Sequence, residues 1–243
     1  MDASPPDAYP GGELELFREA RNWKAYLAQQ LAHVLEGEVL EVGAGIGGMT
    51  RGLCHARHSR WLALESDPEL AAHIRADAES GRFAGTVEVQ VGTLTNLAPD
   101  ARFDALLYAD VLEHIENDAE ELASAATHLR PGGSLIVIAP AHEWLYSEFD
   151  RAIGHHRRYT TESMRALSPP GLSLHRVRYL DAAGMLASMA NRWLLHRDLP
   201  TARQIATWDR LLVPVSRWLD PLFAHRLGKT VLAIWSDAQE VRC

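Results

Sequence analysis

Residues 40–48, LEVGAGIGG, place four glycines within nine positions. The apolar residues before the glycines are typical of a short buried strand, and GMTRGLCHA, residues 48–56, has helical spacing. Glycine adopts positive φ and carries no side chain, so such a turn lets main-chain N–H groups approach a ligand closely. The stretch therefore predicts a ligand-binding turn between a strand and a helix.

Strand and helix patterns continue to alternate after this turn. Apolar stretches of strand length occupy residues 38–43, 61–65, 86–92, 103–109 and 134–140. Helical patterns occupy 48–56, 68–80 and 118–130, and Asp67-Pro68 supplies an N-cap and a first-turn proline for the second helix. This alternation predicts an α/β fold, a Rossmann-like doubly wound sheet that binds ligands at the carboxyl ends of its parallel strands.

The composition argues against several classes of protein. The chain has 243 residues and 47% hydrophobic content, enough for one sizeable core, so we expect a single domain over 13–243. Acidic residues outnumber basic ones by 32 to 24, and this field repels nucleic acid. Residues 1–12 are acidic and rich in Pro and Gly, which predicts a disordered tail and no secretory signal. We therefore expect a cytoplasmic protein without stable membrane insertion.

The glycines fit two ligand-binding patterns at once. Gly43, Gly45 and Gly48 match the G-x-G-x-x-G of dinucleotide-binding enzymes, which makes an NAD-dependent oxidoreductase one hypothesis. Gly43, Gly45 and Gly47, preceded by Glu41, match the E-x-G-x-G-x-G of enzymes that use S-adenosylmethionine. The glycines alone do not choose between these ligands.

The acidic residues favour the second ligand. Glu65 ends the second predicted strand and can accept hydrogen bonds from both hydroxyls of a ribose, which either ligand carries. Glu41 attracts a sulfonium and an ammonium group but repels a pyrophosphate, although it could also cap local backbone N–H groups. Further acids surround the end of the fourth predicted strand: Asp104, Asp110, Glu113, Glu116 and Asp118.

The motifs VLEVGAGIGG, LALESDPEL, FDALLYADVLEHI and LRPGGSLIVIAP follow one another in order. With them the chain resembles the class I S-adenosylmethionine-dependent methyltransferases over roughly residues 38–140. The segment YSEFDRAIGHHRRYT, residues 146–160, resembles the D-x-x-x-G-H-x-R-R-Y of a bacterial subgroup that methylates small molecules. This resemblance implies a seven-stranded sheet whose last strand is antiparallel.

The resemblance also implies a cofactor site for S-adenosyl-L-methionine. Glu41 and the three glycines would hold the methionine part, and Glu65 the ribose. Thr93 stands where the family often has an aspartate near the adenine, and Ala109 and Asp110 would face the methionine or the methyl group. The implied cofactor-binding set is Glu41, Gly43, Gly45, Gly47, Glu65, Thr93, Leu94, Ala109 and Asp110.

Methyl transfer from a sulfonium is an in-line displacement that needs alignment, exclusion of water and, for some acceptors, a base. Candidate catalytic residues follow the fifth predicted strand: His155, Asp150, Tyr146 and Tyr159. His155 is the preferred base because histidine titrates near neutral pH. In the structural alternative, His155 and Arg157 hydrogen-bond to Asp150 and fix the loop.

Three neighbouring residues, His156, Arg157 and Arg158, are candidates for binding the substrate. The two arginines could bind a carboxylate or phosphate, or pair with the acids named above. Glu113-His114 and His155-His156 could supply metal ligands if folded together, but they match no known ligand spacing, so no metal site is predicted.

The predicted domain has four parts. They are N-terminal helices at 13–36, a cofactor-binding core at 37–140, an active-site loop at 141–165, and a helical roof or homodimer face at 181–227. The predicted function is methylation of a small-molecule acceptor, at a hydroxyl first and at nitrogen or carbon second. The alternatives are a same-fold enzyme without methyl transfer, cyclase-like or a decarboxylase, the oxidoreductase, and a non-catalytic binding protein.

Overall fold

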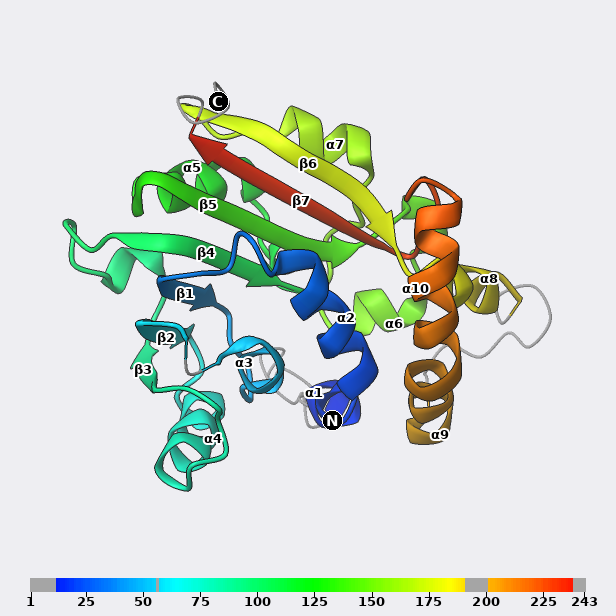
Figure 1. The fold of residues 1–243 in the computed structure, drawn as a ribbon, viewed down its shortest axis with the longest axis horizontal. Coiled ribbons are helices and arrows are strands. Elements are labelled where there is room, and N and C mark those ends of the chain that lie inside the picture. Colours follow the sequence, from blue (N-terminus) through cyan, green and yellow to red (C-terminus); the bar gives the residue numbers. More distant parts are fainter. Residues whose placement is uncertain (1–11, 56, 191–200, 238–243) are drawn as a thin grey trace, which may run out of the picture.

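The computed structural model describes residues 12–55, 57–190 and 201–237, and within them one seven-stranded sheet has the order β3-β2-β1-β4-β5-β7-β6 (Figure 1). The strands are β1 (Glu38–Val42), β2 (Arg60–Glu65), β3 (Val87–Val91), β4 (Phe103–Ala109), β5 (Leu129–Pro140), β6 (Leu172–Leu180) and β7 (Thr230–Asp237). β1 to β5 are parallel, and β7 lies antiparallel between β5 and β6. The predicted α/β sheet with an antiparallel last strand is confirmed.

The strand order creates a ligand crevice beside β1. The chain runs outward from β1 through β2 to β3, then returns to β4 on the other side of β1. Loops leaving β1 and β4 therefore diverge, which opens space at the carboxyl ends of these two strands. The glycine turn after β1 and the Asp110 loop after β4 both line this space.

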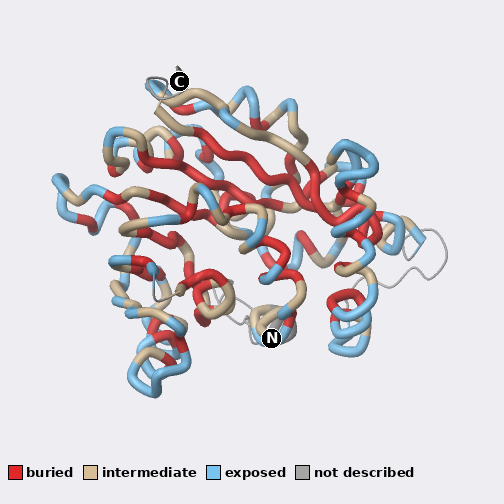
Figure 2. The backbone as a smooth tube through the Cα atoms, viewed as in Figure 1, coloured by how far each residue is buried: buried red, intermediate tan, exposed pale blue. Residues whose placement is uncertain are grey.

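Helices cover both faces of the sheet, because the strand residues alternate between two apolar surfaces. Leu106 and Tyr108 of β4 pack in one buried cluster, while Ala105 and Leu107 pack in the other. Figure 2 shows the buried backbone concentrated along the central strands of the sheet. The helices that begin the chain and follow β1 and β2 are α1 (Gly12–Arg18), α2 (Arg21–Leu31), α3 (Gly48–Leu53) and α4 (Pro68–Glu79). Those after β4 and β5 are α5 (Asp118–Ala126), α6 (Glu148–Ala152) and α7 (Thr161–Ala166), with short 3₁₀ turns at Leu94–Asn96, Leu112–His114 and Glu143–Leu145.

Local signals placed several boundaries correctly. The Asp67 carboxylate accepts the Glu69 and Leu70 N–H groups at 2.7 and 3.3 Å, and Pro68 is the first residue of α4. β5 begins at Leu129, earlier than the predicted 134, because Leu129 pairs with Phe103 across a bulge in the β4–β5 ladder. Residues 1–11 of the predicted tail lie outside the described residues, and Gly12 already belongs to α1.

The segment predicted as a roof contains α8 (Ala182–Ala190), α9 (Ala202–Thr207), a π-helical turn (Trp208–Leu212) and α10 (Val213–Leu222). Three buried aspartates hold it together. Asp181 accepts from Ser216 and Trp208, Asp209 accepts the Trp23 N–H at the start of α2, and Asp220 accepts from the Tyr26 hydroxyl. No helix among the described residues is both long enough and apolar enough to span a bilayer.

Candidate active site

A cavity of about 2050 Å³ opens at the carboxyl ends of β1 and β4. It is larger than a typical pocket for one small ligand, so it has room for a cofactor and a second molecule. The predicted site residues that line it are Glu41, Gly43, Gly45, Glu65, Ala109, Asp110, Tyr146, Asp150, His155 and Arg158. Residues of α8, α9 and the π-helical turn line it from the other side, including Trp208.

Three glycines give the turn after β1 its shape. Gly43, Gly45 and Gly47 have φ values of +67°, +57° and +74°, a region that other residues rarely adopt. Gly48 begins α3 without a positive φ. The backbone therefore requires glycine at the E-x-G-x-G-x-G positions, and not at the final glycine of the dinucleotide pattern.

Gly43→Ala should lower the free energy of unfolding by about 2–4 kcal/mol. A Cβ at this position would lie 2.7 Å from Cγ2 of Val111 and would hold an L side chain at φ +67°. Gly81 has the same φ, and a Cβ added there would have no atom within 4 Å, so Gly81→Ala should lose only the conformational part. Urea unfolding of both variants measures the difference, and equal losses would contradict the proposed clash.

Glu41 lies beneath the glycine turn, and the residue is 2% exposed. Its Oε2 accepts hydrogen bonds from the Thr50 hydroxyl at 2.6 Å and from the Trp61 indole N–H at 2.9 Å. Burial raises the pKa of Glu41 to about 7, although both hydrogen bonds oppose that rise. The Thr50 backbone N–H also bonds to this carboxylate, so the capping of local N–H groups that the sequence offers as an alternative is present beside the two side-chain contacts.

Glu65 connects the glycine turn to the end of β2. One oxygen accepts the Gly45 N–H at 2.7 Å, and the other accepts the Asp67 N–H at 2.9 Å. The carboxylate is buried and also lines the cavity. It therefore stands at the strand end where the sequence predicts a ribose acceptor.

The loop after β5 is built around Asp150. This carboxylate accepts hydrogen bonds from His155 Nδ1 at 3.0 Å, from Arg158 Nε at 2.9 Å and from Ser147. Burial raises the pKa of Asp150, but the bonds from His155 and Arg158 outweigh it and hold the pKa below its ordinary value. The loop-fixing arginine is Arg158 and not the predicted Arg157, which pairs with Asp118 at 2.7 Å.

The remaining predicted residues are not all brought to the cavity. Tyr159 is 2% exposed, and its hydroxyl donates to Asp118 and the Leu112 carbonyl, so it ties the loop to the core. The side chain of His156 is exposed, outside the lining. The Tyr146 hydroxyl donates to the His155 carbonyl at 2.7 Å.

The two residues predicted beside the adenine, Thr93 and Leu94, do not line this cavity. Leu94 is 3% exposed and packs in the core, whereas Thr93 is exposed and caps a 3₁₀ turn with Asn96. Gly47 also lies outside the lining, next to Phe83 and Ile74. The structure therefore brings Glu41, Gly43, Gly45 and Glu65 of the predicted methionine and ribose set to one cavity, but not Gly47 or the predicted adenine pair.

Sequence reasoning missed a charged group opposite the glycine turn. Lys229, at the start of β7, lines the cavity with its ammonium 4.2 Å from the Trp208 ring centre and 3.6 Å from Asp181. Loss of solvation raises the pKa of Asp110 to about 6, although the nearby groups of His155, Lys229 and Arg158 oppose this rise. A lysine that precedes a strand carries no local signal of this role, since its partners come from distant segments.

Comparison with known proteins agrees with this geometry. Residues 40–137 match the family model described as "Methyltransferase domain". A Mycolicibacterium smegmatis protein described as "Probable S-adenosylmethionine-dependent methyltransferase" is 34% identical over 114 residues, which is 46% of this chain and 42% of that protein. The chain spans 42% to 63% of the length of the first curated relatives that it matches.

Solved structures share the fold over nearly the whole chain. One is a chain from the structure described as "Complex between the Haloferax volcanii Trm112 methyltransferase activator and the putative methyltransferase". It has a TM-score of 0.63 at 19% identity, covering 98% of this chain and 99% of that one. Coclaurine N-methyltransferase, solved with N-methylheliamine and S-adenosylhomocysteine, has a TM-score of 0.62 at 13% identity, covering 90% and 72%.

Residues 40–137 thus match a methyltransferase domain, and the Mycolicibacterium smegmatis relative is described as S-adenosylmethionine-dependent. The cofactor that these relatives imply is S-adenosylmethionine. The residues present fit it, because Gly43 and Gly45 leave a cradle without side chains, and Glu41 places a buried acid beneath the turn.

Proposed function

We propose that the protein transfers a methyl group from S-adenosylmethionine to a small-molecule acceptor, with a hydroxyl as the first choice of acceptor atom and nitrogen or carbon as the second. The observation that carries this proposal is that one cavity is lined both by Glu41, Glu65 and the glycine turn and by His155 and Asp110. The bound cofactor supplies an activated methyl group. The chain's own residues then bind, align and exclude water.

The size and walls of the cavity support a small acceptor. Apolar residues from several segments line it, among them Phe17, Phe149, Ile153 and Trp208. These walls suit an acceptor with an apolar body, and the formal charge of −8 opposes a nucleic acid. A role for His155 in taking a proton from a hydroxyl is supported by the contact of its Nδ1 with Asp150, which leaves Nε2 on the side of Glu113, and by its position in the cavity lining.

Calorimetric titration of the protein with S-adenosylmethionine, S-adenosylhomocysteine and NADH tests the first half of the proposal. Micromolar binding of the two sulfur ligands without NADH binding supports it, and the reverse result restores the oxidoreductase hypothesis. Incubation with methyl-labelled cofactor and acceptor pools tests the second half. A labelled small molecule supports methyl transfer, whereas an altered acceptor without label points to the non-transferring alternative.

His155→Gln should lower kcat for a hydroxyl acceptor by about 10²–10⁴-fold, with little change in cofactor affinity. Glutamine can still hydrogen-bond to Asp150, so the loop keeps its position while the base is lost. His73 is exposed on α4, and His73→Gln serves as the matched control. A kcat within twofold of wild type would leave His155 with a loop-fixing role only.

We also propose that the outer face of α10 and the preceding turn is a homodimer surface. Leu211, Val215, Trp218 and Leu222 recur at helical spacing, and each is exposed by between 46% and 83%. Sedimentation analysis of the wild type and of Trp218→Ser tests this. A monomer at every concentration in the wild type would contradict it.

A further inference from the structure

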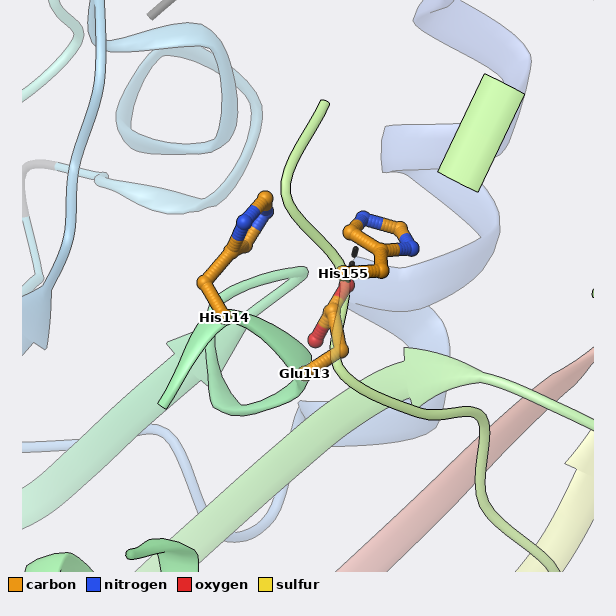
Figure 3. A group of neighbouring side chains, drawn as sticks. All are labelled: Glu113, His114 and His155. Atoms are coloured by element: carbon orange, nitrogen blue, oxygen red, sulfur yellow. Dashed lines mark ion pairs between the residues drawn. The ribbon is translucent and has the colours of Figure 1, made fainter. Parts of the chain in front are cut away.

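A buried Glu–His–His cluster lies on the floor of the cavity. One ligand atom each from Glu113, His114 and His155 lies within 4.8 Å of the others (Figure 3). Glu113 and His114 come from the 3₁₀ turn after β4, and His155 comes from the loop after β5. Two segments that are about forty positions apart therefore meet through three potential ligands.

Glu113 is the observation that points to a cation. The residue is 0% exposed, and neither of its carboxylate oxygens accepts a hydrogen bond from any described residue. The His155 imidazole lies beside it, with Nε2 at 3.7 Å from Oε1, beyond hydrogen-bond distance. A buried carboxylate without hydrogen bonds is costly unless it takes up a proton or a positive charge stands beside it.

His155 already has the orientation that a ligand needs. His155 Nδ1 lies 3.0 Å from the Asp150 carboxylate, so Nδ1 carries the proton and the Nε2 lone pair faces Glu113. This carboxylate–histidine arrangement is the usual outer contact of a metal-binding histidine. The His114 ring packs edge-on against His155, with 4.6 Å between the ring centres, on the other side of Glu113 (Figure 3).

We propose that Glu113, His114 and His155 bind a divalent transition-metal ion of the zinc, cobalt or nickel kind. Two imidazoles and one carboxylate suit these ions better than magnesium or calcium, which prefer oxygen ligands. Tetrahedral bonds of about 2.1 Å place ligand atoms about 3.4 Å apart, so the groups have to close by small side-chain rotations. Three protein ligands leave a coordination position directed at the cavity, as in catalytic zinc sites.

The open position gives the ion a use that rests on the proposed function. An acceptor oxygen bound there would be held beside Asp110, at the end of β4 and near the methyl donor site. Coordination makes a hydroxyl more acidic, which would assist the same acceptor class that His155 is otherwise placed to deprotonate. Ion binding itself does not depend on methyl transfer, so the two proposals can be tested separately.

The test is titration of tag-free, EDTA-treated protein with Co²⁺ and Zn²⁺, followed by calorimetry and by visible absorption of bound cobalt. We expect one equivalent of each ion, with cobalt bands of a four- or five-coordinate site. Glu113→Gln and His155→Ala should each weaken binding by about 100-fold or more. His156→Ala removes the exposed neighbouring histidine and should retain the wild-type affinity.

Three results would overturn the metal site. These are no binding of either ion, unchanged affinity in Glu113→Gln, or a loss of affinity in His156→Ala equal to that in His155→Ala. Circular dichroism and S-adenosylhomocysteine titration are run on every variant, and His114→Gln replaces any that fails to fold. Normal cofactor binding without metal binding would reject this inference alone, whereas metal binding without cofactor binding would reject the proposed function alone.

Discussion

Glu65→Ala should weaken binding of S-adenosylmethionine by at least about 100-fold. A carboxylate at the end of β2 can accept two hydrogen bonds from a ribose, and charge-assisted hydrogen bonds contribute about 1.5–3 kcal/mol each. Loss of two such bonds corresponds to about 3 kcal/mol or more, which is about a hundredfold in affinity. Calorimetry with S-adenosylmethionine and S-adenosylhomocysteine should show the same loss for both ligands, because both carry the ribose.

A structural contribution of Glu65 has to be separated from ribose binding. The carboxylate also accepts the Gly45 and Asp67 N–H groups, so its removal loosens the glycine turn. Glu65→Gln keeps one carbonyl oxygen as an acceptor and should lose less affinity than Glu65→Ala. Glu69→Ala removes an exposed acid from the next helix and is the matched control. Unchanged affinity in Glu65→Ala would remove Glu65 from the ribose site.

The sheet and the glycine turn could be predicted because their signals are local. The apolar stretch at 103–109 alternates between two buried faces, and the glycines at 43, 45 and 47 are required by positive φ at those same positions. Such features need no knowledge of distant residues.

The contacts inside the loop after β5 could not be predicted, because each depends on which distant group approaches. Arg157 and Arg158 are adjacent and chemically alike, yet one pairs with Asp118 and the other with Asp150. Tyr159 carries a hydroxyl that could act in catalysis, but packing directs this hydroxyl to a hydrogen bond with Asp118. Burial, which the sequence does not give residue by residue, decides these roles.

The roof shows the same limit on a larger scale. Asp181, Asp209 and Asp220 lie in a stretch that reads only as helical and tryptophan-containing. In the structure they accept hydrogen bonds from Trp208, from the start of α2 and from Tyr26, and so join the roof to the N-terminal helices. Polar contacts between distant segments therefore join the roof to α2, which hydrophobic periodicity does not reveal.

Glu41→Gln should separate folding stability from cofactor binding. The pKa of Glu41 is about 7 in the folded protein and 4.5 in an exposed state, so the folded protein binds the proton more tightly. Stability from this group is fully present below pH 4.5 and is lost as pH rises through about 7, at a cost of about 3 kcal/mol. The glutamine variant keeps acceptors for Thr50 and Trp61 without a charge, so urea unfolding at pH 8 should show it to be more stable than wild type.

Cofactor binding should change in the opposite direction. Glu41→Gln removes the negative charge beneath the methionine site, so affinity for S-adenosylmethionine at pH 8 should fall by about 10–100-fold. The wild-type advantage should shrink as pH falls through about 7, where Glu41 takes up its proton, and the ratio of the two affinities isolates this group from any titration of the ligand. A ratio that stays constant from pH 6 to pH 8 would show that the Glu41 charge does not act on the cofactor, and would leave the residue with its hydrogen bonds to Thr50 and Trp61 as its only role.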